Sequence, residues 1–368
     1  MPPVFSRPNW ATIDLAALRH NAQVLASHAA PARLMAVVKA GAYGHGALEV
    51  ARALGSVEEV TMLGVASVDE AQVLRAGGIE TEILLLSAIL PEEADAAIEL
   101  NVAVTVYDAA AAAALNAVAA RRNRRARLHF KVDTGMSRLG ANWCDAAPVF
   151  REIRAQKHVA IVGIYTHFAC ADEENDFTTI QLRRFQEFCT QIGPQSRVLK
   201  HAANSAGALR FPDAHFDLVR SGIALYGAHP CREIGPSLDL RPVMTWRARV
   251  SSLKTVARGE SVSYGRAWTA PRDSRIAVVP AGYADGYFRA LSNRGEVLIH
   301  GRRCPVVGRV TMDQIMVDVT EISIQIGDEV VLWGAGLPVE DVAARADTIS
   351  YELLCAVSSR VPRVYLNA

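Results

Sequence analysis

Lys39 ends the apolar run LMAVVK, and the small-residue segment AGAYGHG follows it. A lysine ammonium is rarely buried without a partner, so the simplest interpretation is a solvated strand end. The alternative is a lysine that projects into a cleft, where its amine acts as a nucleophile or forms a Schiff base. The choice between the two depends on whether other titratable groups occupy equivalent positions in the chain.

The first 230 residues alternate short β-branched runs with amphipathic or alanine-rich segments. This alternation predicts a parallel sheet with right-handed crossovers. Eight such units, preceded by a helix over 15–28, predict an α/β fold, a (β/α)8 TIM-type barrel, with a doubly wound open sheet as the alternative. The predicted strands are 34–39, 62–66, 83–87, 103–107, 127–133, 160–167, 198–201 and 217–219.

Polar side chains end or follow five of these eight apolar runs, and active sites of such barrels form where the strands end at the C-terminal face. Solvated strand ends produce some of this pattern, but not so many titratable groups after buried runs. The barrel therefore favours the catalytic interpretation of Lys39. The residues at these ends are Lys39, Lys131 with Asp133, His167, His201 with Asn204, and Arg220.

Two short segments after the last two predicted strands carry groups that bind phosphate. The segment 204–207 (NSAG) offers a hydroxyl and backbone amides at the start of a short helix. The segment 220–223 (RSGI) offers a glycine at which a phosphate oxygen can approach the backbone. Each alone is better explained as a helix cap or a turn, but their joint position predicts a phosphate site.

After Tyr226 the pattern changes. The segment GAHPCREIGPSLDLRP is rich in proline and glycine and is typical of a linker. Short strands separated by turns then predict a mostly antiparallel β domain, with two short helices near the end. We therefore divide the chain into residues 1–235 and 236–368, and the first strand-like residues are candidates to join the β domain. The predicted strands are 244–256, 276–280, 296–299, 305–310, 316–319 and 329–333.

Composition excludes several classes of protein. The net charge of +1 gives no bulk attraction to nucleic acid or to acidic membranes. The basic run 121–125 follows an alanine-rich helix and is best explained as its solvated C-terminal end. Six scattered cysteines without a CxxC pair argue against a metal site or a disulfide framework. No apolar stretch has the length of a signal peptide or a membrane helix, so we expect a cytoplasmic protein.

Nine segments spread from residue 37 to residue 355 resemble, in order, those of the alanine racemases. The resemblance implies a pyridoxal-phosphate enzyme with a barrel and a β domain, which interconverts L-alanine and D-alanine and works as a homodimer with shared active sites. The segments are VVKAGAYGHG, FKVDTGMSRLG, HFACADE, HAANSAG, DLVRSGIALYG, VSYG, PAGYADGY, VGRVTMDQ and ISYELLC.

The resemblance also implies roles for particular residues. Lys39 would hold the cofactor covalently and act as one base, and Tyr264 of the partner subunit would be the other base. Arg220 would face the pyridine nitrogen, and His167 would link Arg220 to Tyr264. The remaining cofactor-binding positions, most of them at the phosphate, would be Tyr43, Asn204, Ser205, Gly222, Ile223 and Tyr351.

Further residues would bind the substrate. Arg138 would contact the substrate carboxylate and the phenolic oxygen of the cofactor, and the Met312 amide of the partner subunit would take the other carboxylate oxygen. Tyr283 would narrow the entrance. Lys131 would hold Arg138, often as a carbamate, and Asp313 would have a supporting role.

Arg220 is the most informative of these positions. Many other pyridoxal-phosphate enzymes place a carboxylate at the ring nitrogen, which keeps that nitrogen protonated. Arginine cannot accept the proton, so the ring nitrogen should stay neutral and the negative charge on the α-carbon should be short-lived. This favours racemisation over transamination or decarboxylation.

Three other functions compete with this one. A broad-specificity amino-acid racemase is the nearest, although such enzymes are typically exported. A barrel-type decarboxylase would need an acidic residue at the ring nitrogen and a glycine-triplet phosphate loop. A non-catalytic cofactor carrier would need neither the β domain nor Tyr264. One position departs from the family pattern: Gly41 replaces the common Asn or Asp, and we expect it to loosen the loop after Lys39.

Overall fold

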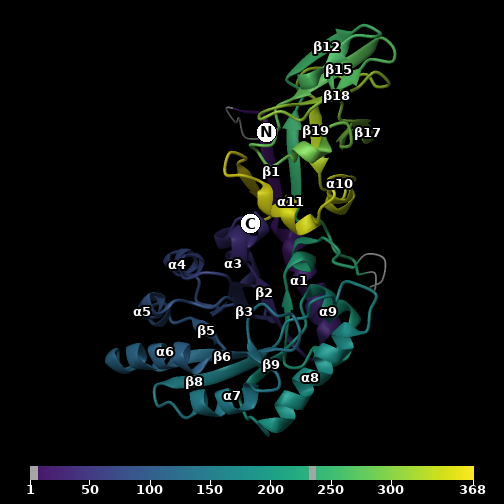
Figure 1. The fold of residues 1–368 in the computed structure, drawn as a ribbon. Helices are drawn as coiled ribbons and strands as arrows, with labels where there is room; N and C mark the ends of the chain where they lie inside the picture. The colour runs from purple at the N-terminus through teal and green to yellow at the C-terminus, as the bar shows by residue number, and fades with distance from the viewer. Residues whose placement is uncertain (1–6, 232–237) are drawn as a thin grey trace.

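The computed structural model describes residues 7–231 and 238–368, which form a parallel barrel followed by a β-rich domain (Figure 1). This confirms the predicted fold class. The proposed division between residues 235 and 236 lies outside the described residues. The first strand, β1 (Asn9–Asp14), joins the sheet of the C-terminal domain, where it pairs with β11 (Met244–Arg249) and with β20 (Arg363–Leu366).

Eight parallel strands form the barrel, in the order β10-β2-β3-β4-β5-β6-β8-β9, and the short β7 (Ala141–Asn142) pairs with β6 outside this ring. Two backbone hydrogen bonds between the segments that contain the terminal strands bring the ring close to closure: Asp217 N to Lys200 O and Arg220 N to Ala203 O, both 3.0 Å. The strands are β2 (Arg33–Val37), β3 (Val60–Val65), β4 (Glu82–Leu85), β5 (Ala103–Val106), β6 (Ala126–Asp133), β8 (Val159–Tyr165), β9 (Leu199–His201) and β10 (Leu218–Ser221).

Helices cover the outside of the barrel, and four of them, α1, α4, α6 and α9, start at a side-chain cap. Asp14, Ser67, Asp108 and Asn204 each accept backbone N–H groups at a helix start, which satisfies donors that the helix leaves unpaired. The helices are α1 (Leu15–Ala29), α3 (Ala47–Leu54), α4 (Val68–Ala76), α5 (Ala94–Glu99), α6 (Ala109–Arg121), α7 (Ala146–Arg154), α8 (Phe177–Gln191) and α9 (Ser205–Arg210). Short 3-10 turns are η1 (Pro91–Glu93), η2 (Pro212–Ala214) and η3 (Ile223–Tyr226).

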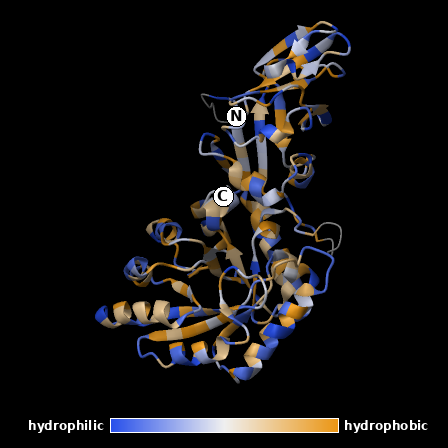
Figure 2. Cartoon of the chain, viewed as in Figure 1, coloured by the Kyte–Doolittle hydropathy of each residue, from blue (hydrophilic) through white to orange (hydrophobic). Residues whose placement is uncertain are grey.

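Strand β6, with the sequence ARLHFKVD, shows how the barrel places polar groups inside. Successive side chains of a strand point to opposite faces. Phe130 packs outward against Phe150 and Phe188, with ring centroids 5.5 and 5.8 Å away. His129 and Lys131 therefore point into the barrel. In Figure 2 the barrel strands are largely in hydrophobic colours, whereas the covering helix α8 carries both hydrophobic and hydrophilic colours.

The C-terminal domain contains a six-stranded sheet, in the order β17-β16-β19-β11-β1-β20, and a three-stranded sheet, in the order β12-β15-β18. All strand pairs here are antiparallel except β1 with β20. Two helices, α10 (Val339–Arg345) and α11 (Ser350–Ala356), return toward the barrel. The strands are β12 (Ser252–Val256), β13 (Ser261–Val262), β14 (Trp268–Thr269), β15 (Ser274–Val279), β16 (Glu296–Ile299), β17 (Arg302–Pro305), β18 (Ile315–Asp318) and β19 (Glu329–Trp333), with 3-10 turns η4 (Tyr264–Arg266) and η5 (Arg289–Leu291).

Several predicted strand ends differ from the structure, and three of them concern site residues. Strand β2 stops at Val37, and Lys39 begins a separate turn, α2 (Lys39–Tyr43). Strand β8 stops at Tyr165, so His167 lies in the loop that follows. Arg220 lies inside β10 rather than after it, because buried acceptors satisfy its guanidinium and the strand continues through it. Among the described residues no helix is long and apolar enough to cross a membrane.

Candidate active site

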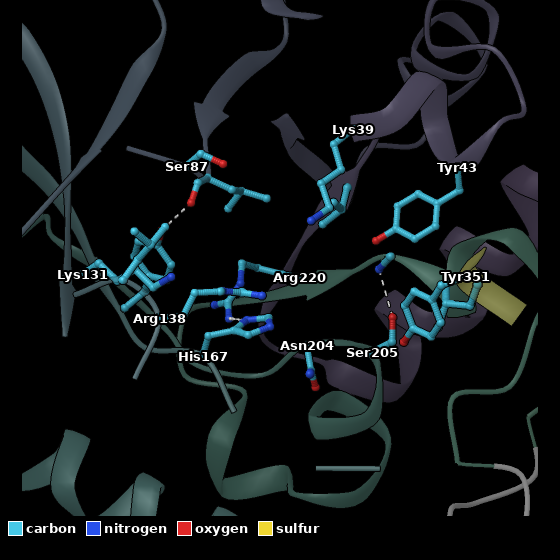
Figure 3. Close-up of a pocket in the computed structure, with 16 residues that line it drawn as sticks. Lys39, Tyr43, Ser87, Lys131, Arg138, His167, Asn204, Ser205, Arg220 and Tyr351 are labelled. Atoms are coloured by element: carbon cyan, nitrogen blue, oxygen red, sulfur yellow. Dashed lines mark hydrogen bonds between the residues drawn. The ribbon is translucent and has the colours of Figure 1, made fainter. Parts of the chain in front are cut away.

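A cavity of about 450 Å³ opens at the C-terminal ends of the barrel strands. Figure 3 shows the Lys39 ammonium, the Tyr43 hydroxyl and the Arg220 guanidinium directed toward the same central space. Tyr351, on α11, is the contribution of the C-terminal domain to the lining. The lining residues are Val37, Lys39, Tyr43, Leu86, Ser87, Lys131, Arg138, Leu139, Tyr165, His167, Asn204, Ser205, Arg220, Gly222, Ile223 and Tyr351.

The turn α2, which carries Lys39 and Tyr43, is left-handed. Four consecutive residues have positive φ: Ala40 at +53°, Gly41 at +61°, Ala42 at +55° and Tyr43 at +52°. Glycine adopts this conformation without strain, and Asn and Asp tolerate it better than other residues. A left-handed position is one that glycine, asparagine and aspartate can all occupy, so Gly41 fits this turn, and its loosening effect on the loop stays a prediction.

Two lysines in the cavity have lowered pKa values. Burial, followed by the positive charge of Arg138, lowers the pKa of Lys39, and Glu70 and Cys355 act in the opposite direction. Burial, followed by Arg220 and Arg138, lowers the pKa of Lys131 to about 8. Both amines therefore reach the neutral, nucleophilic form more readily than an exposed lysine.

Arg220 is buried, with 3% of its surface exposed, and none of the described carboxylates pairs with it. Its guanidinium donates to the backbone oxygens of Thr166 and Ala202, both at 2.8 Å, and to His201 Nδ1 at 2.8 Å. It also donates to His167 Nδ1 at 3.2 Å. These bonds fix the direction of the cation without neutralising it, and burial lowers its pKa to about 10.

The histidines beside Arg220 must be neutral, because a guanidinium can only donate and each accepting nitrogen needs its lone pair. Burial, followed by Arg220, holds the pKa values of His167 and His201 well below the usual range. His201 Nε2 then donates to His129 Nδ1 at 2.8 Å. In the same way His167 carries its proton on Nε2 and can donate it away from Arg220.

The opposite end of the cavity offers hydroxyls and amides to an anion. Ser205 Oγ accepts from the Gly222 and Ala224 amides at 2.9 and 3.4 Å, which brings α9 and η3 together. A Cβ atom at Gly222 would lie 2.3 Å from the Tyr43 hydroxyl, so only glycine allows this approach. Asn204 caps α9 by accepting from the Gly207 amide at 2.8 Å.

The charge of the lining is one-sided. It contains four cationic side chains, Lys39, Lys131, Arg138 and Arg220, and no aspartate or glutamate. Like charges in one low-dielectric cavity repel one another, so the arrangement calls for an anionic ligand. A ligand with both a phosphate and a carboxylate would satisfy both ends of the cavity.

Four of the predicted residues of the C-terminal domain do not line this cavity. Tyr264, Met312 and Tyr283 are exposed, at 75%, 53% and 44% of their surface. Asp313 lies beside Met312, where its carboxylate accepts from Arg360 at 2.7 Å and its backbone oxygen accepts from Arg7 at 2.6 Å. The structure therefore brings together the barrel residues and Tyr351, and leaves these four apart from them.

The sequence interpretation missed a tyrosine under the cationic groups. Tyr165 stacks on His201, with ring centroids 4.6 Å apart, and the charged groups of Arg220 and Lys131 lie 5.2 and 5.4 Å from its ring centre. Its hydroxyl is 2.7 Å from Thr105 Oγ1. The sequence of β6 could have indicated these polar groups inside the barrel. Period-two alternation in RLHFKVD places His129 on the same face of the strand as Lys131.

Two family comparisons cover most of the chain. The alanine racemase N-terminal domain matches residues 13–230, and the alanine racemase C-terminal domain matches residues 243–365. Alanine racemase of Symbiobacterium thermophilum is 45% identical over 368 residues, which cover 98% of this chain and 97% of that protein. Alanine racemase of Desulforamulus reducens is also 45% identical, over 98% and 99% of the two chains.

Solved structures agree with these sequence relatives. Alanine racemase of Clostridium difficile 630 superposes with a TM-score of 0.93 at 36% identity and covers 99% of this chain and 97% of that one. Alanine racemase of Bartonella henselae, described with covalently bound pyridoxal phosphate, superposes with a TM-score of 0.90 at 32% identity, over 99% and 100% of the two chains. This chain, with its cationic barrel cavity, therefore belongs to the alanine racemase family.

Proposed function

We propose that this protein interconverts L-alanine and D-alanine with pyridoxal phosphate as its cofactor. The observation that carries the proposal is Arg220, a buried cation without a carboxylate partner among the described residues, in the same cavity as Lys39. When bound, the cofactor spreads the negative charge that deprotonation leaves on the α-carbon of the substrate. An arginine at its ring nitrogen limits that spreading and favours rapid return of the proton.

The residues present fit this cofactor. Lys39 would hold it covalently, since burial lowers the pKa of its amine. The phosphate would lie among the hydroxyls of Tyr43, Ser205 and Tyr351 and the amides of Gly222 and Ile223, with Asn204 fixing the start of α9. The cavity lacks carboxylates that would repel a phosphate. Covalent attachment in the Bartonella henselae relative supports the same arrangement here.

Racemisation needs proton transfer on both faces of the α-carbon, and this chain supplies two bases for it. Lys39 would move the proton on one face after the substrate displaces it from the cofactor. Tyr264 of the partner subunit would act on the other face. His167 supports this role, because its Nδ1 accepts from Arg220 and leaves Nε2–H to donate to the phenolic oxygen.

The substrate carboxylate would be held by Arg138 and by the Met312 amide of the partner subunit, with Tyr283 of the partner subunit at the entrance. Lys131 lies in the same cavity as Arg138, and its pKa of about 8 makes its amine available for carbamylation by carbon dioxide. A carbamate would replace one of the four positive charges with a negative one, which would orient Arg138 by hydrogen bonding. Asp313 would support the Met312 turn.

The proposal requires a homodimer, because Tyr264, Met312 and Tyr283 are exposed and none of them lines the cavity of its own chain. Closed twofold dimers are the commonest soluble assemblies, and a shared site is compatible with that symmetry. We also propose a cytoplasmic location, which is supported by six cysteines that are all free.

An assay with purified protein tests the function. Loaded with pyridoxal phosphate, the protein should convert L-alanine to D-alanine and back, measured with a coupled D-amino-acid oxidase assay, and borohydride should fix the cofactor to Lys39. Parallel assays with lysine, arginine and serine separate an alanine racemase from a broad-specificity enzyme. Carbon dioxide release without racemisation would instead indicate a decarboxylase.

A further inference from the structure

The two peptide groups on either side of Lys39 are both held by hydrogen bonds. The carbonyl of Val38, which precedes Lys39, accepts from the Ala42 amide at 2.8 Å. The amide of Ala40, which follows Lys39, donates to Glu70 Oε1 at 2.6 Å. Because these two peptide planes determine the direction of the Lys39 Cα–Cβ bond, the Glu70 carboxylate is one of two anchors that aim the lysine.

Glu70 is itself fixed by a second contact. Its Oε2 accepts from the amide of Ala66 at 2.7 Å, and Ala66 directly follows β3. Its own amide donates to Ser67 Oγ at 3.3 Å at the start of α4. One carboxylate thus bridges the loops that follow two neighbouring barrel strands, β2 and β3. A carboxylate has two acceptor oxygens, which an amide side chain cannot replace.

The turn that Glu70 holds is strained. A left-handed conformation costs a residue with a Cβ atom roughly 1–2 kcal/mol, and α2 contains three such residues besides Gly41. Strained backbone persists where its surroundings determine it from several sides. At the far end of the turn, His45 Nδ1 contacts the carbonyls of Ala42 and Tyr43 at 3.0 and 2.9 Å. Glu70 is the side-chain anchor at the Lys39 end.

We propose that Glu70 is a positioning residue, which holds the left-handed turn so that Lys39 and Tyr43 face the same cavity. This inference rests on the proposed role of Lys39. Glu70 does not line the cavity, so its effect passes through the backbone of Ala40. The rival explanation is that Glu70 acts only as a negative charge near Lys39.

Glu70→Gln and Asp69→Asn form a matched pair. Both remove one negative charge from the first turn of α4, but Asp69 is exposed and its side chain makes no hydrogen bond within the described residues. Glu70→Gln leaves one of the two amides facing an NH2 group. In cofactor-free protein, hydrogen exchange of residues 38–46 should become roughly tenfold faster or more in Glu70→Gln, because a charge-assisted bond is lost. Asp69→Asn should leave that exchange unchanged.

The cofactor-loaded protein gives two further readouts. In Glu70→Gln, visible circular dichroism of the lysine-bound cofactor should change, because the attachment point moves. The kcat for alanine should fall roughly tenfold or more while KM changes much less, since misaligned reacting groups slow the reaction step. If Glu70→Gln only lowered the stability of the protein and did not displace Lys39, the dichroism and the kcat of the correctly folded protein would be unchanged.

Two more variants separate position from charge. Glu70→Asp keeps the charge but shortens the side chain, so it should behave like Glu70→Gln if both amides must be reached. Ala40→Gly removes the left-handed strain at the residue that Glu70 holds, so the double variant Ala40→Gly with Glu70→Gln should recover part of the lost kcat. Wild-type behaviour of Glu70→Asp, or no recovery in the double variant, would overturn the inference in favour of a charge effect.

These outcomes remain distinguishable from failure of the proposed function. If the wild-type protein does not racemise alanine, the proposed function is wrong, whereas hydrogen exchange in the cofactor-free protein still reports whether Glu70 holds the turn. If the wild type racemises alanine and the exchange of residues 38–46 is the same in Glu70→Gln and Asp69→Asn, the function stands and the positioning role is wrong.

Discussion

The barrel cavity and the β domain differ in how far their predicted site residues are exposed to solvent. In the barrel, Lys131 and Arg220 are 4% and 3% exposed, and histidines, carbonyls and aromatic rings surround Arg220. In the β domain, Tyr264 and Met312 are 75% and 53% exposed. Arg220 finds its hydrogen-bond acceptors within its own chain, so its placement in the barrel half does not depend on a partner subunit. In the proposed homodimer, a second copy of the chain would cover the exposed half.

This difference also divides the chemistry. The barrel half contains the groups expected to bind a cofactor and tune its charge, and these groups line one cavity of a single chain. The β-domain half contains the proposed second base, whose aromatic ring is exposed to solvent in a single chain. Exposed aromatic groups are common at interfaces. The dimer would therefore switch on proton transfer rather than cofactor binding.

The largest effect is expected at Lys39. Lys39→Ala removes both the covalent anchor and one proposed base, so racemisation should fall by at least about 10⁴-fold. Borohydride treatment followed by peptide mapping should find no pyridoxyl group on the chain. Lys157→Ala, at an exposed lysine, is the control and should keep both activity and labelling. A pyridoxyl group on another lysine of the wild type would contradict the assignment.

The next effect tests whether the two halves come from different chains. Tyr264→Phe should lower racemisation by roughly a thousandfold, because it removes a proton-transfer group. Mixing Tyr264→Phe with Lys39→Ala under conditions that exchange subunits should restore about a quarter of wild-type activity, since half of the dimers hold one intact site. Full activity of the wild type as a monomer in sedimentation would rule out the shared site.

A third variant tests the charge at the ring nitrogen. Arg220→Glu should slow racemisation roughly a hundredfold, because a carboxylate favours the protonated ring and stabilises the intermediate charge. Long-wavelength absorbance should appear with alanine, and side transamination should rise. Loss of proton transfer by Tyr264 alone gives no such band, so the spectrum separates a change at the ring nitrogen from loss of the second proposed base.

Arg33→Glu is the matched control for this change, because Arg33 is exposed and begins β2 at the opposite end of the barrel from the cavity. If Arg220→Glu binds the cofactor and racemises at the wild-type rate without a long-wavelength band, Arg220 does not act on the ring nitrogen. Cofactor content and near-ultraviolet circular dichroism establish that the variant is folded.

The smallest effect concerns Lys131 in cofactor-free protein in bicarbonate-free buffer. Its folded pKa of about 8 lies below the unfolded value of about 10.4, so the unfolded chain binds more protons between these values. The free energy of unfolding should therefore rise as pH increases from about 8 to about 10. Lys131→Met should be more stable than the wild type at pH 7, by an amount on the order of 1–3 kcal/mol, and this gain should shrink with rising pH. Denaturant unfolding at several pH values measures this difference in the free energy of unfolding, with Lys157→Met as the control. A gain that does not depend on pH would contradict a buried charge at Lys131.

The barrel was predictable because its strands are short apolar runs between helices, and this pattern depends on burial of the whole sheet. The polar strand ends were predictable for the same reason. The left-handed turn after Lys39 was not, because Ala40 and Ala42 have no preference for positive φ and the bond from the Ala40 amide to Glu70 joins residues distant in sequence. Sequence spacing therefore located Lys39 but not the geometry that aims it.

The buried network around Arg220 was predicted only in part. Arg220 and His167 were expected together, and the structure places them 3.2 Å apart. Tyr165 and His129 were missed, because a tyrosine and a histidine inside a barrel strand look like ordinary core residues until the facing strands are known. The roles of Tyr264 and Met312 stay predictions, since they depend on a second copy of the chain.

The placement of β1 has a consequence for synthesis of the protein. The ribosome releases this strand before the barrel, but its two neighbours, β11 and β20, begin only at residues 244 and 363. The nascent chain must therefore carry an apolar strand with open edges while the entire barrel emerges, a state that favours pairing with other chains. Chaperone contact with residues 9–14 and release only after β20 has emerged are the expected result. A circularly permuted gene that starts within the linker would place β1 after both β11 and β20, so β1 would find its two partner strands already made.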